Sequence, residues 1–311
     1  MSNIELEDLT KRFEQTIAVN NISLSIKEGE IFGLIGPNGA GKTTMINMIS
    51  GLLMPDGGGL KIAGLDFIKT KWKLKRKIGL IPQDLAIYND LSAYDNVKFF
   101  GSLYGLKGKT LRKSVEQALE AVGLESHLKK LPKAFSGGMK RRLNIACGIV
   151  HRPDLIIFDE PTVGIDPQSR NHILETIREL NSRGSTIIYT THYMEEAEQL
   201  CRDIAIIDHG KIIARGTKEE LKNLISDQSR LIIHTLKDAG SWVDDLKRIQ
   251  GIHEIEAEDG SLIINSQRDV FNLGEIISFL NSKQIPIHSV LNDTPNLEMV
   301  FLSLTGRKLR D

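Results

Sequence analysis

The sequence predicts an α/β fold, in which a doubly wound parallel sheet is followed by a smaller α+β appendage. Three observations predict it. Apolar runs such as 155–158 are nearly continuous, as in strands that are buried on both faces of a parallel sheet. These runs alternate with stretches in which apolar residues recur every three or four positions, as in helices. A glycine-rich loop joins the apolar run 31–35 to the helical stretch 45–49, which gives a strand–turn–helix unit.

The elements of the larger part follow from the same two periodicities. We expect short strands within 4–26, a helix after the glycine-rich loop, a turn at the three glycines 57–59 and a strand over 60–63. A strand over 78–81 stops at Pro82, and the pattern is helical from 91 to 130. A second glycine pair opens a helix from Met139 to Ile149. Strands at 155–158, 186–189 and 204–207 and a helix at 167–182 complete this part.

The rest of the chain predicts a second, smaller domain. The composition becomes polar near 218–229, where we expect a linker helix. The strands expected beyond it are 231–233, 252–257, 262–265 and 285–291, and the helices are 242–249, 270–280 and 297–304. The order βαββαβ indicates a ferredoxin-like appendage. The predicted domains are therefore 1–217, with a helical subdomain at about 84–150, a linker at 218–229 and an accessory domain at 230–311.

Composition excludes several classes of protein. The 311 residues include 40 Lys and Arg against 40 Asp and Glu, so no overall field attracts nucleic acid or acidic membranes. Cys147 and Cys201 lie in apolar stretches, which favours buried free thiols in a reducing compartment over a disulfide. The first ten residues do not read as a secretion signal, and no apolar run reaches the roughly 18 residues of a membrane span. We therefore expect a soluble intracellular protein that reaches a membrane only through a partner.

One charged segment has two interpretations. Residues 69–77 contain six Lys or Arg and no acidic residue. A helix face exposed to solvent is the simpler interpretation, and a contact with lipid headgroups or a partner is the other.

The glycine-rich loop has the spacing of a phosphate-binding loop. Its glycines allow successive backbone N–H groups to point at one anion, and the helix that follows presents its positive end to that anion. Lys42 adds a cation for the β- and γ-phosphates, and the Thr43 hydroxyl is placed to ligate Mg²⁺. The loop consists of Gly36, Pro37, Asn38, Gly39, Ala40, Gly41, Lys42, Thr43 and Thr44. The sequence therefore predicts a site for a nucleoside triphosphate.

Two carboxylates follow the buried strand at 155–158. Ligands of open α/β sheets lie beyond the carboxyl ends of the strands, where Asp159 is placed to hold Mg²⁺. Glu160, one residue further on, is suited to polarise an attacking water. Alone, such a pair reads as surface acids, but after a phosphate loop it predicts hydrolysis.

The order of the motifs resembles that of the nucleotide-binding subunits of ABC transporters. Gln83 follows a strand, Phe135-Ser136-Gly137-Gly138-Met139 comes next, then Asp159-Glu160, then a loop ending in Asp166, then His192. The resemblance covers about residues 3–217 and includes every motif of the family in the family's order. Three positions depart from the usual family residue, Phe13, Phe135 and Met139, and none of them removes a charge or a phosphate ligand.

The resemblance implies a role for each site residue. Glu160, His192 and Gln83 would be catalytic, and Thr43, Gln83 and Asp159 would contact Mg²⁺. Phe13 would stack on adenine. Ser136, Gly137 and Gly138 form the signature element, which in the family contacts ATP bound to the other subunit, and Asp166 belongs to a loop at the dimer contact. The cofactors implied are ATP and Mg²⁺.

The resemblance also implies the partners. Two copies of the chain, or the chain and a paralogue, would meet head to tail around two ATP and drive export through a separate membrane-spanning permease. The protein would then lie at the cytoplasmic face of the membrane. Residues 137–143, 103–106 and 296–306 resemble type-two exporters of drugs, bacteriocins and polysaccharides.

Two alternative functions remain. One is a soluble ABC-type ATPase that acts on ribosomes or DNA. The other is a regulatory protein that binds ATP without turnover, and the intact Glu160 argues against it. No nucleic acid is expected as a partner.

Overall fold

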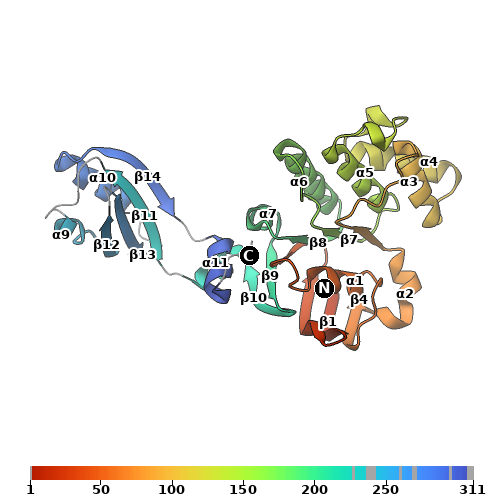
Figure 1. The fold of residues 1–311 in the computed structure, drawn as a ribbon, viewed down its shortest axis with the longest axis horizontal. Helices are drawn as coiled ribbons and strands as arrows, with labels where there is room; N and C mark the ends of the chain where they lie inside the picture. The colour runs from red at the N-terminus through yellow and green to blue at the C-terminus, as the bar shows by residue number, and fades with distance from the viewer. Residues whose placement is uncertain are drawn as a thin grey trace. The chain divides into compact units, whose positions relative to one another are not determined.

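The computed structural model describes residues 2–225, 228–235, 243–258, 261–267, 272–293 and 296–306. The chain divides into two compact units, residues 1–218 and residues 219–306. Each unit has its own sheet or sheets and its own apolar core (Figure 1).

A six-stranded sheet forms the centre of the first unit. Its strand order is β10-β9-β3-β8-β7-β6, and all neighbours are parallel except the edge strand β10, which is antiparallel to β9. The strands are β3 (Ile31–Ile35), β6 (Ile78–Ile81), β7 (Leu155–Asp159), β8 (Thr186–Thr191), β9 (Asp203–Asp208) and β10 (Lys211–Thr217). β3, β7 and β8 are buried along their whole length, as the continuous apolar runs predict. Because parallel strands end at one edge, the segments after β3, β7 and β8 are brought together there.

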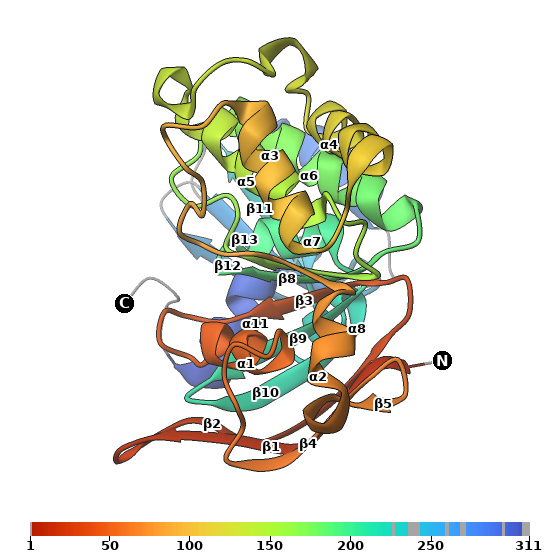
Figure 2. The ribbon, with the colours of Figure 1, turned by 90° about the vertical axis from the view of Figure 1, so that its right-hand side faces the viewer.

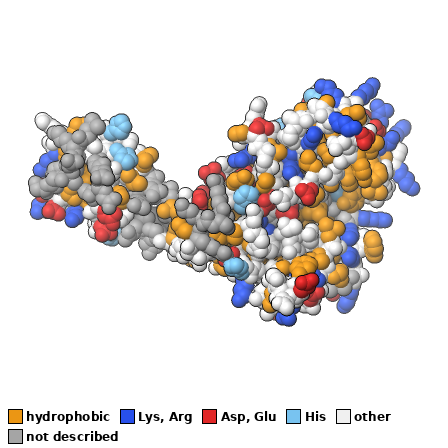
Figure 3. Space-filling view, viewed as in Figure 1, with side chains coloured by type: hydrophobic (Ala, Val, Ile, Leu, Met, Phe, Trp, Pro, Cys, Tyr) orange, Lys and Arg blue, Asp and Glu red, His pale blue; other side chains and the backbone are white. Residues whose placement is uncertain are grey.

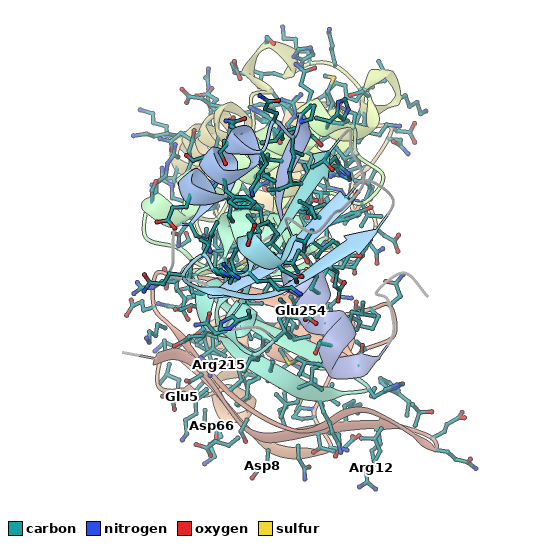
Figure 4. The ribbon with its side chains drawn as sticks, turned by 90° about the vertical axis from the view of Figure 1, so that its left-hand side faces the viewer. Glu5, Asp8, Arg12, Asp66, Arg215 and Glu254 are labelled. Atoms are coloured by element: carbon teal, nitrogen blue, oxygen red, sulfur yellow. The ribbon has the colours of Figure 1, made fainter. Side chains whose placement is uncertain are left out.

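A second, antiparallel sheet of the first unit has the order β2-β1-β4-β5. It consists of β1 (Ser2–Phe13), β2 (Thr16–Lys27), β4 (Gly57–Ile62) and β5 (Leu65–Asp66). Asp8 and Arg12, both exposed, stand along β1 (Figure 4). The guanidinium of Arg215 on β10 donates to the Ser25 carbonyl on β2 over 2.7 Å, which links the two sheets.

The expected turn at 57–59 is wrong, because these glycines are the first half of β4 and pair with β1. Gly58 has φ +85°, and a Cβ there would lie 2.4 Å from the Glu7 carbonyl oxygen. The glycines are thus required by the close approach of two strands and not by a reversal of the chain. The strands expected within 4–26 are also longer than expected, with twelve residues each in β1 and β2.

The helices of the first unit lie on both sides of the six-stranded sheet (Figure 2). The region 91–130 is not one helical run, since α3 and α4 are separated by a turn at Gly105 and α4 gives way to short 3₁₀ turns after Gly123, both at positive φ. These helices are α1 (Lys42–Ile49), α2 (Phe67–Lys75), α3 (Ala93–Leu103), α4 (Gly108–Ala121), α5 (Gly137–Ile149), α6 (Pro167–Ser182) and α7 (Met194–Leu200). The next helix, α8 (Lys218–Asn223), begins at the last residue of the first unit and continues in the second.

The two cysteines are buried free thiols, as expected. Among the described residues, no helix has the length and apolar character that a membrane crossing requires.

The second unit contains a four-stranded antiparallel sheet in the order β12-β13-β11-β14. Its elements are β11 (Gln228–Thr235), α9 (Val243–Leu246), β12 (Ile252–Glu258), β13 (Ser261–Gln267), α10 (Leu273–Ser282), β14 (Ile287–Asp293) and α11 (Leu297–Thr305). The βαββαβ order and the second strand at one edge give the ferredoxin-like arrangement that the sequence predicts. β11 begins at Gln228, within the expected linker, and residues 242, 270 and 271 of the expected helices lie outside the described residues.

Candidate active site

The phosphate loop, residues 36–44, joins the end of β3 to the start of α1. Gly41 stands at the N-cap of α1 with φ 107°, and a Cβ there would lie 2.3 Å from the Ala18 carbonyl oxygen. A side chain is therefore excluded by conformation and by space. No side chain caps the N-terminus of α1, so its backbone N–H groups are left for an anion at the positive end of the helix dipole.

Lys42 is buried under the loop and folds back on it. Its ammonium donates to the carbonyl oxygens of Gly36 at 2.8 Å and Pro37 at 3.0 Å. It also pairs with Glu160 Oε1 at 3.1 Å, and both side chains are about 95% buried, with 5% and 6% exposed. A buried charge needs a partner. Glu160 therefore neutralises the Lys42 ammonium at the place where the phosphates of a nucleotide would otherwise do so.

Asp159, the last residue of β7, faces the phosphate loop. Its Oδ2 accepts a hydrogen bond from the Thr43 hydroxyl at 3.2 Å, and its Oδ1 accepts one from the Thr190 hydroxyl at 2.8 Å. Burial raises the pKa of Asp159 above its ordinary value, and the two hydroxyl groups and Lys42 partly oppose that shift. The carboxylate is thus held in a polar cradle that spans the ends of two parallel strands.

Glu160 has a constrained backbone and a fixed side chain. Its φ is +46°, in the left-handed region that costs a non-glycine residue about 1–2 kcal/mol. Its N–H donates to the Thr190 hydroxyl at 3.0 Å, and its Oε2 is 3.1 Å from His192 Nδ1. The carboxylate therefore stands between the Lys42 ammonium and the His192 imidazole, which together fix its position.

A third buried carboxylate, that of Glu196 on α7, joins the segments that carry Glu160 and His192. Its Oε2 accepts hydrogen bonds from the hydroxyl groups of Thr162 at 2.9 Å, Tyr189 at 2.7 Å and Thr191 at 2.9 Å. Its Oε1 is 3.4 Å from Arg170 Nε on α6. Burial, ahead of the charge of Glu196, raises the pKa of Tyr189 well above its ordinary value, so this phenol stays a donor.

The signature element, Ser136–Gly138, forms the start of α5. The Ser136 hydroxyl accepts from the Met139 N–H at 3.2 Å, which makes Ser136 the N-cap. A Cβ at Gly138 would lie 2.1 Å from Ser169 Oγ and 3.5 Å from Asp166 Oδ2, so the glycine lets α5 and α6 begin side by side. Asp166 caps α6 by accepting from the Ser169 N–H at 2.9 Å, and this bond is the main reason that its pKa is lowered.

The structure brings the expected residues together in two places and not in one. Lys42, Thr43, Asp159, Glu160 and His192 are connected by contacts. The start of α5, with Asp166 beside it, lies across the six-stranded sheet from α1 (Figure 2). The phosphate loop and the signature element therefore belong to two separate groups of residues, with no contact between them given by the hydrogen bonds and ion pairs of the described residues.

Two expected site residues stand apart from these contacts. Phe13 is 47% exposed at the end of β1, with Lys11 Nζ 5.7 Å from its ring centre. Gln83 is exposed two residues after β6, the strand next to β7. Both side chains are exposed, and the Gln83 amide forms no hydrogen bond within the described part of the chain.

Sequence reasoning missed the residues that support the site. The Thr190 hydroxyl donates to the Asp159 carboxylate and accepts from the Glu160 N–H, and Thr162, Tyr189, Thr191 and Glu196 fix the segments around them. A signal was present in the run Tyr189-Thr190-Thr191, which places three hydroxyl groups at the end of an otherwise apolar strand, next to His192. No pattern marked Glu196, whose partners lie up to 34 residues away along the chain.

The donor set suits a magnesium ion that arrives with phosphate. The Thr43 hydroxyl and the Asp159 carboxylate already face each other at 3.2 Å, and oxygen ligands are those that Mg²⁺ prefers. No group of three or more His, Cys, Asp or Glu side chains among the described residues forms a metal site by itself. An ion held here would therefore take its remaining ligands from phosphate and water.

Comparisons with known proteins agree with this geometry. The family profile described as ABC transporter matches residues 19–163. The chain is 43% identical to the linearmycin resistance ATP-binding protein of Bacillus subtilis (strain 168), over 99% of this chain and all of that protein. The chain belongs to the ABC transporter ATP-binding proteins. It is an ATPase of this family.

Other relatives match over a similar length. The chain is 36% identical to the Nod factor export ATP-binding protein I of Ralstonia nicotianae, over 99% of this chain and 95% of that one. It is 35% identical to the daunorubicin/doxorubicin resistance ATP-binding protein of Streptomyces peucetius, over 99% of this chain and 94% of that one. Among solved structures, a dimeric ATP-binding cassette in a post-hydrolysis state with ADP and Pi matches with a TM-score of 0.63 and 28% identity, covering 69% of this chain and 98% of that one.

Proposed function

We propose that this ATPase powers export through a separate membrane-spanning permease, at the cytoplasmic face of the membrane. The observation that carries the proposal is the match over nearly the whole length to ATP-binding proteins named for antibiotic resistance or for Nod factor export. These relatives match the second unit as well as the first. The solved cassette covers only 69% of this chain and so does not span the second unit in full.

Residues of one copy divide the work of hydrolysis between them. Lys42 and the N–H groups at the start of α1 bind the β- and γ-phosphates, and Phe13 offers an exposed ring for the adenine. Glu160 accepts the proton of the attacking water, and His192, 3.1 Å from it, orients the carboxylate and contacts the γ-phosphate. Gln83 meets the water or the metal from the end of β6. Thr43 and Asp159, with Gln83, would hold Mg²⁺, which neutralises charge on the phosphates.

The second half of each site comes from another copy. Ser136 and Gly137, exposed at the start of α5, form an anion site with free N–H groups at a helix N-terminus. Because this element lies across the sheet from α1, two chains must meet head to tail to complete two sites (Figure 2). ATP supplies the charge that both copies neutralise, so binding closes the dimer and loss of the γ-phosphate opens it.

We assign residues 1–217 to the ATPase domain, with its helical subdomain at about 84–150. Residues 218–229 are the linker, and residues 230–311 are the accessory domain. The two compact units support the first of these boundaries, since one unit ends at Lys218 and the other begins at Glu219, while β11 already begins at Gln228 within the proposed linker.

The partner is tested by purification from solubilised membranes. A tagged chain should retain an integral membrane protein, and ATPase activity should depend on that partner. A chain that co-purifies with ribosomes or DNA and with no membrane protein would instead support a soluble ABC-type ATPase.

A further inference from the structure

Helix α2 presents a concentrated positive charge on a chain that is neutral overall. Residues 67–77 contain six Lys or Arg and no Asp or Glu, against 40 basic and 40 acidic residues in the whole chain. Lys69 lies 3.9 Å from Asp66, which caps the helix, and Lys77 pairs with Asp154 at 2.7 Å. Lys71, Lys73 and Arg76 have no acidic partner within the described part of the chain. Their charge is therefore available to an anionic surface.

An exposed aromatic ring lies among these charges. Trp72 is 81% exposed, the largest fraction of any large apolar side chain among the described residues. α2 has a kink at Thr70, where φ is -119° and ψ is 18°. Phe67 before the kink and Leu74 after it are buried, at 1% and 0% exposure, and anchor α2 in the core while Trp72 stays exposed. Lys75 Nζ is 5.7 Å from the Trp72 ring centre, and partial burial together with the charge of Lys71 lowers the pKa of Lys75.

Two more apolar side chains extend this surface beyond the helix. Lys71 Nζ is 3.6 Å from the sulfur of Met54, which is 40% exposed. Leu52 is 65% exposed. It follows Gly51, which lies beside α2, since a Cβ at Gly51 would be 3.0 Å from Lys75 Cε. Hydrophobic side chains stand among Lys and Arg side chains over α2 in Figure 3. We define the α2 surface as Leu52, Met54, Lys71, Trp72, Lys73 and Arg76.

The chemistry of the α2 surface matches a membrane interface better than a protein partner. Tryptophan prefers the level of the lipid headgroups, and Lys and Arg place their charges there while their stems cover apolar area. Each Lys or Arg near an anionic leaflet contributes about 1 kcal/mol. A stable protein interface buries roughly 800 Å² on each side, which is large for a helix of nine residues.

We propose that the α2 surface binds the anionic phospholipid surface of the membrane, with Trp72 at the level of the headgroups. This contact acts in addition to attachment through a permease. It depends on the proposed function only because that function brings the chain to the membrane. It would hold the ATPase against the bilayer from one side of its first unit.

Vesicle flotation of the full chain tests this proposal. The chain should bind vesicles that contain phosphatidylglycerol and not vesicles of phosphatidylcholine alone, and added salt should release it. The double variant Lys71→Gln/Lys73→Gln should weaken binding about tenfold or more. The matched control Lys109→Gln/Lys113→Gln, at exposed positions on α4, should leave binding unchanged.

Tryptophan fluorescence locates the contact. The chain has two tryptophans, so the variant Trp242→Phe leaves Trp72 as the reporter. Its emission should shift to shorter wavelength with anionic vesicles. Equal binding by wild type and the double variant, or binding to an acidic polypeptide but not to vesicles, would overturn the proposal. ATP hydrolysis should be the same in all these variants, so a failure here leaves the proposed function standing.

A different observation carries a second inference, which concerns Glu196 and rests on the proposed function. Glu196 is 3% exposed, its Oε2 accepts from three hydroxyl groups, and its Oε1 forms an ion pair with the Arg170 guanidinium. Thr162 lies two residues after Glu160, and Thr191 directly precedes His192. The Thr191 hydroxyl also accepts from the Tyr193 N–H at 2.9 Å, so His192 lies between two fixed neighbours.

The geometry points to Glu196 as a positioning residue that fixes Glu160 and His192 relative to each other. Arg170 extends the same network to α6, four residues after Asp166. A neutral side chain of equal shape would hold three hydroxyl donors less strongly and leave the guanidinium without its carboxylate. The catalytic pair would then lose its separation of 3.1 Å.

Steady-state kinetics of Glu196→Gln test this role, with Glu195→Gln as the matched control, since Glu195 is exposed on the same helix. We expect kcat to fall about tenfold or more while KM for ATP stays within about twofold, as for a group that acts only on the chemical step. The control should behave as wild type. An unchanged kcat in folded Glu196→Gln, or a raised KM with normal kcat, would overturn the assignment, while wild-type hydrolysis would still support the proposed function.

Discussion

The buried pair between Lys42 and Glu160 predicts how one substitution changes both stability and affinity. The pair is 3.1 Å long and about 95% buried on both sides. Removal of one partner from a buried ion pair costs about 3–5 kcal/mol. The carbonyl oxygens of Gly36 and Pro37 still accept from the ammonium in Glu160→Gln, so we expect a smaller loss than this range, roughly 2–3 kcal/mol.

The same pair competes with the nucleotide in the wild type. A phosphate that takes the Lys42 ammonium must displace the Glu160 carboxylate, whereas in Glu160→Gln it meets an unpaired cation. A difference of about 2 kcal/mol corresponds to about thirtyfold tighter ATP binding. The variant should therefore be less stable without ATP and gain more stability from ATP.

Thermal unfolding with and without ATP, in the presence of EDTA, measures both effects. At about 2–4 °C per kcal/mol for a domain of this size, Glu160→Gln should unfold about 5–10 °C below wild type without ATP. The control Glu179→Gln, which removes an exposed carboxylate paired with Arg183, should unfold as wild type does. Equal unfolding temperatures of Glu160→Gln and wild type, with the same increase on ATP addition, would refute the reasoning.

Three further predictions concern single residues. Lys42→Ala should weaken ATP binding at least tenfold, because it removes the phosphate cation and leaves Glu160 buried without it; calorimetric titration checks this, and unchanged affinity would count against the loop. Thr190→Val should lower kcat about tenfold and move the acid limb of the pH–rate profile to higher pH, since Asp159 loses a donor that lowers its raised pKa; an unmoved limb would contradict this. Burial of His151 against Tyr104 lowers its pKa from 6.5 to about 4, so the unfolded chain takes up a proton first as the pH falls. Stability should fall from pH 6.5 towards pH 4 by up to about 1.4 kcal/mol per unit, and His151→Phe should abolish that part of the slope in denaturant titrations; parallel slopes would show that His151 does not titrate in this way.

The site residues that stand in a short, recognisable sequence pattern were predictable from the sequence. The phosphate loop, Asp159 and Glu160 each follow a continuous apolar strand, and the parallel sheet brings those strand ends to one edge. The βαββαβ order of the second unit was predictable for a similar reason, because each element is short and bounded by turn residues.

The residues whose role depends on distant contacts were not predictable. β4 contains three glycines because its backbone approaches β1, and no local pattern separates that from a turn. Glu196 looks like any acid on an amphipathic helix until Thr162, Tyr189 and Thr191 are folded around it. β10 and α7 were missed because an edge strand with partly exposed residues and a helix of seven residues give weak periodic signals.

The mass of Glu160→Gln in solution, measured by sedimentation with and without ATP, tests the pairing of two half-sites most directly. We predict that ATP doubles the mass and that the species binds two ATP for every two chains. A variant that binds ATP with high affinity and keeps the mass of a single chain would contradict a site shared between two copies, if only one copy is also present when the membrane partner is bound.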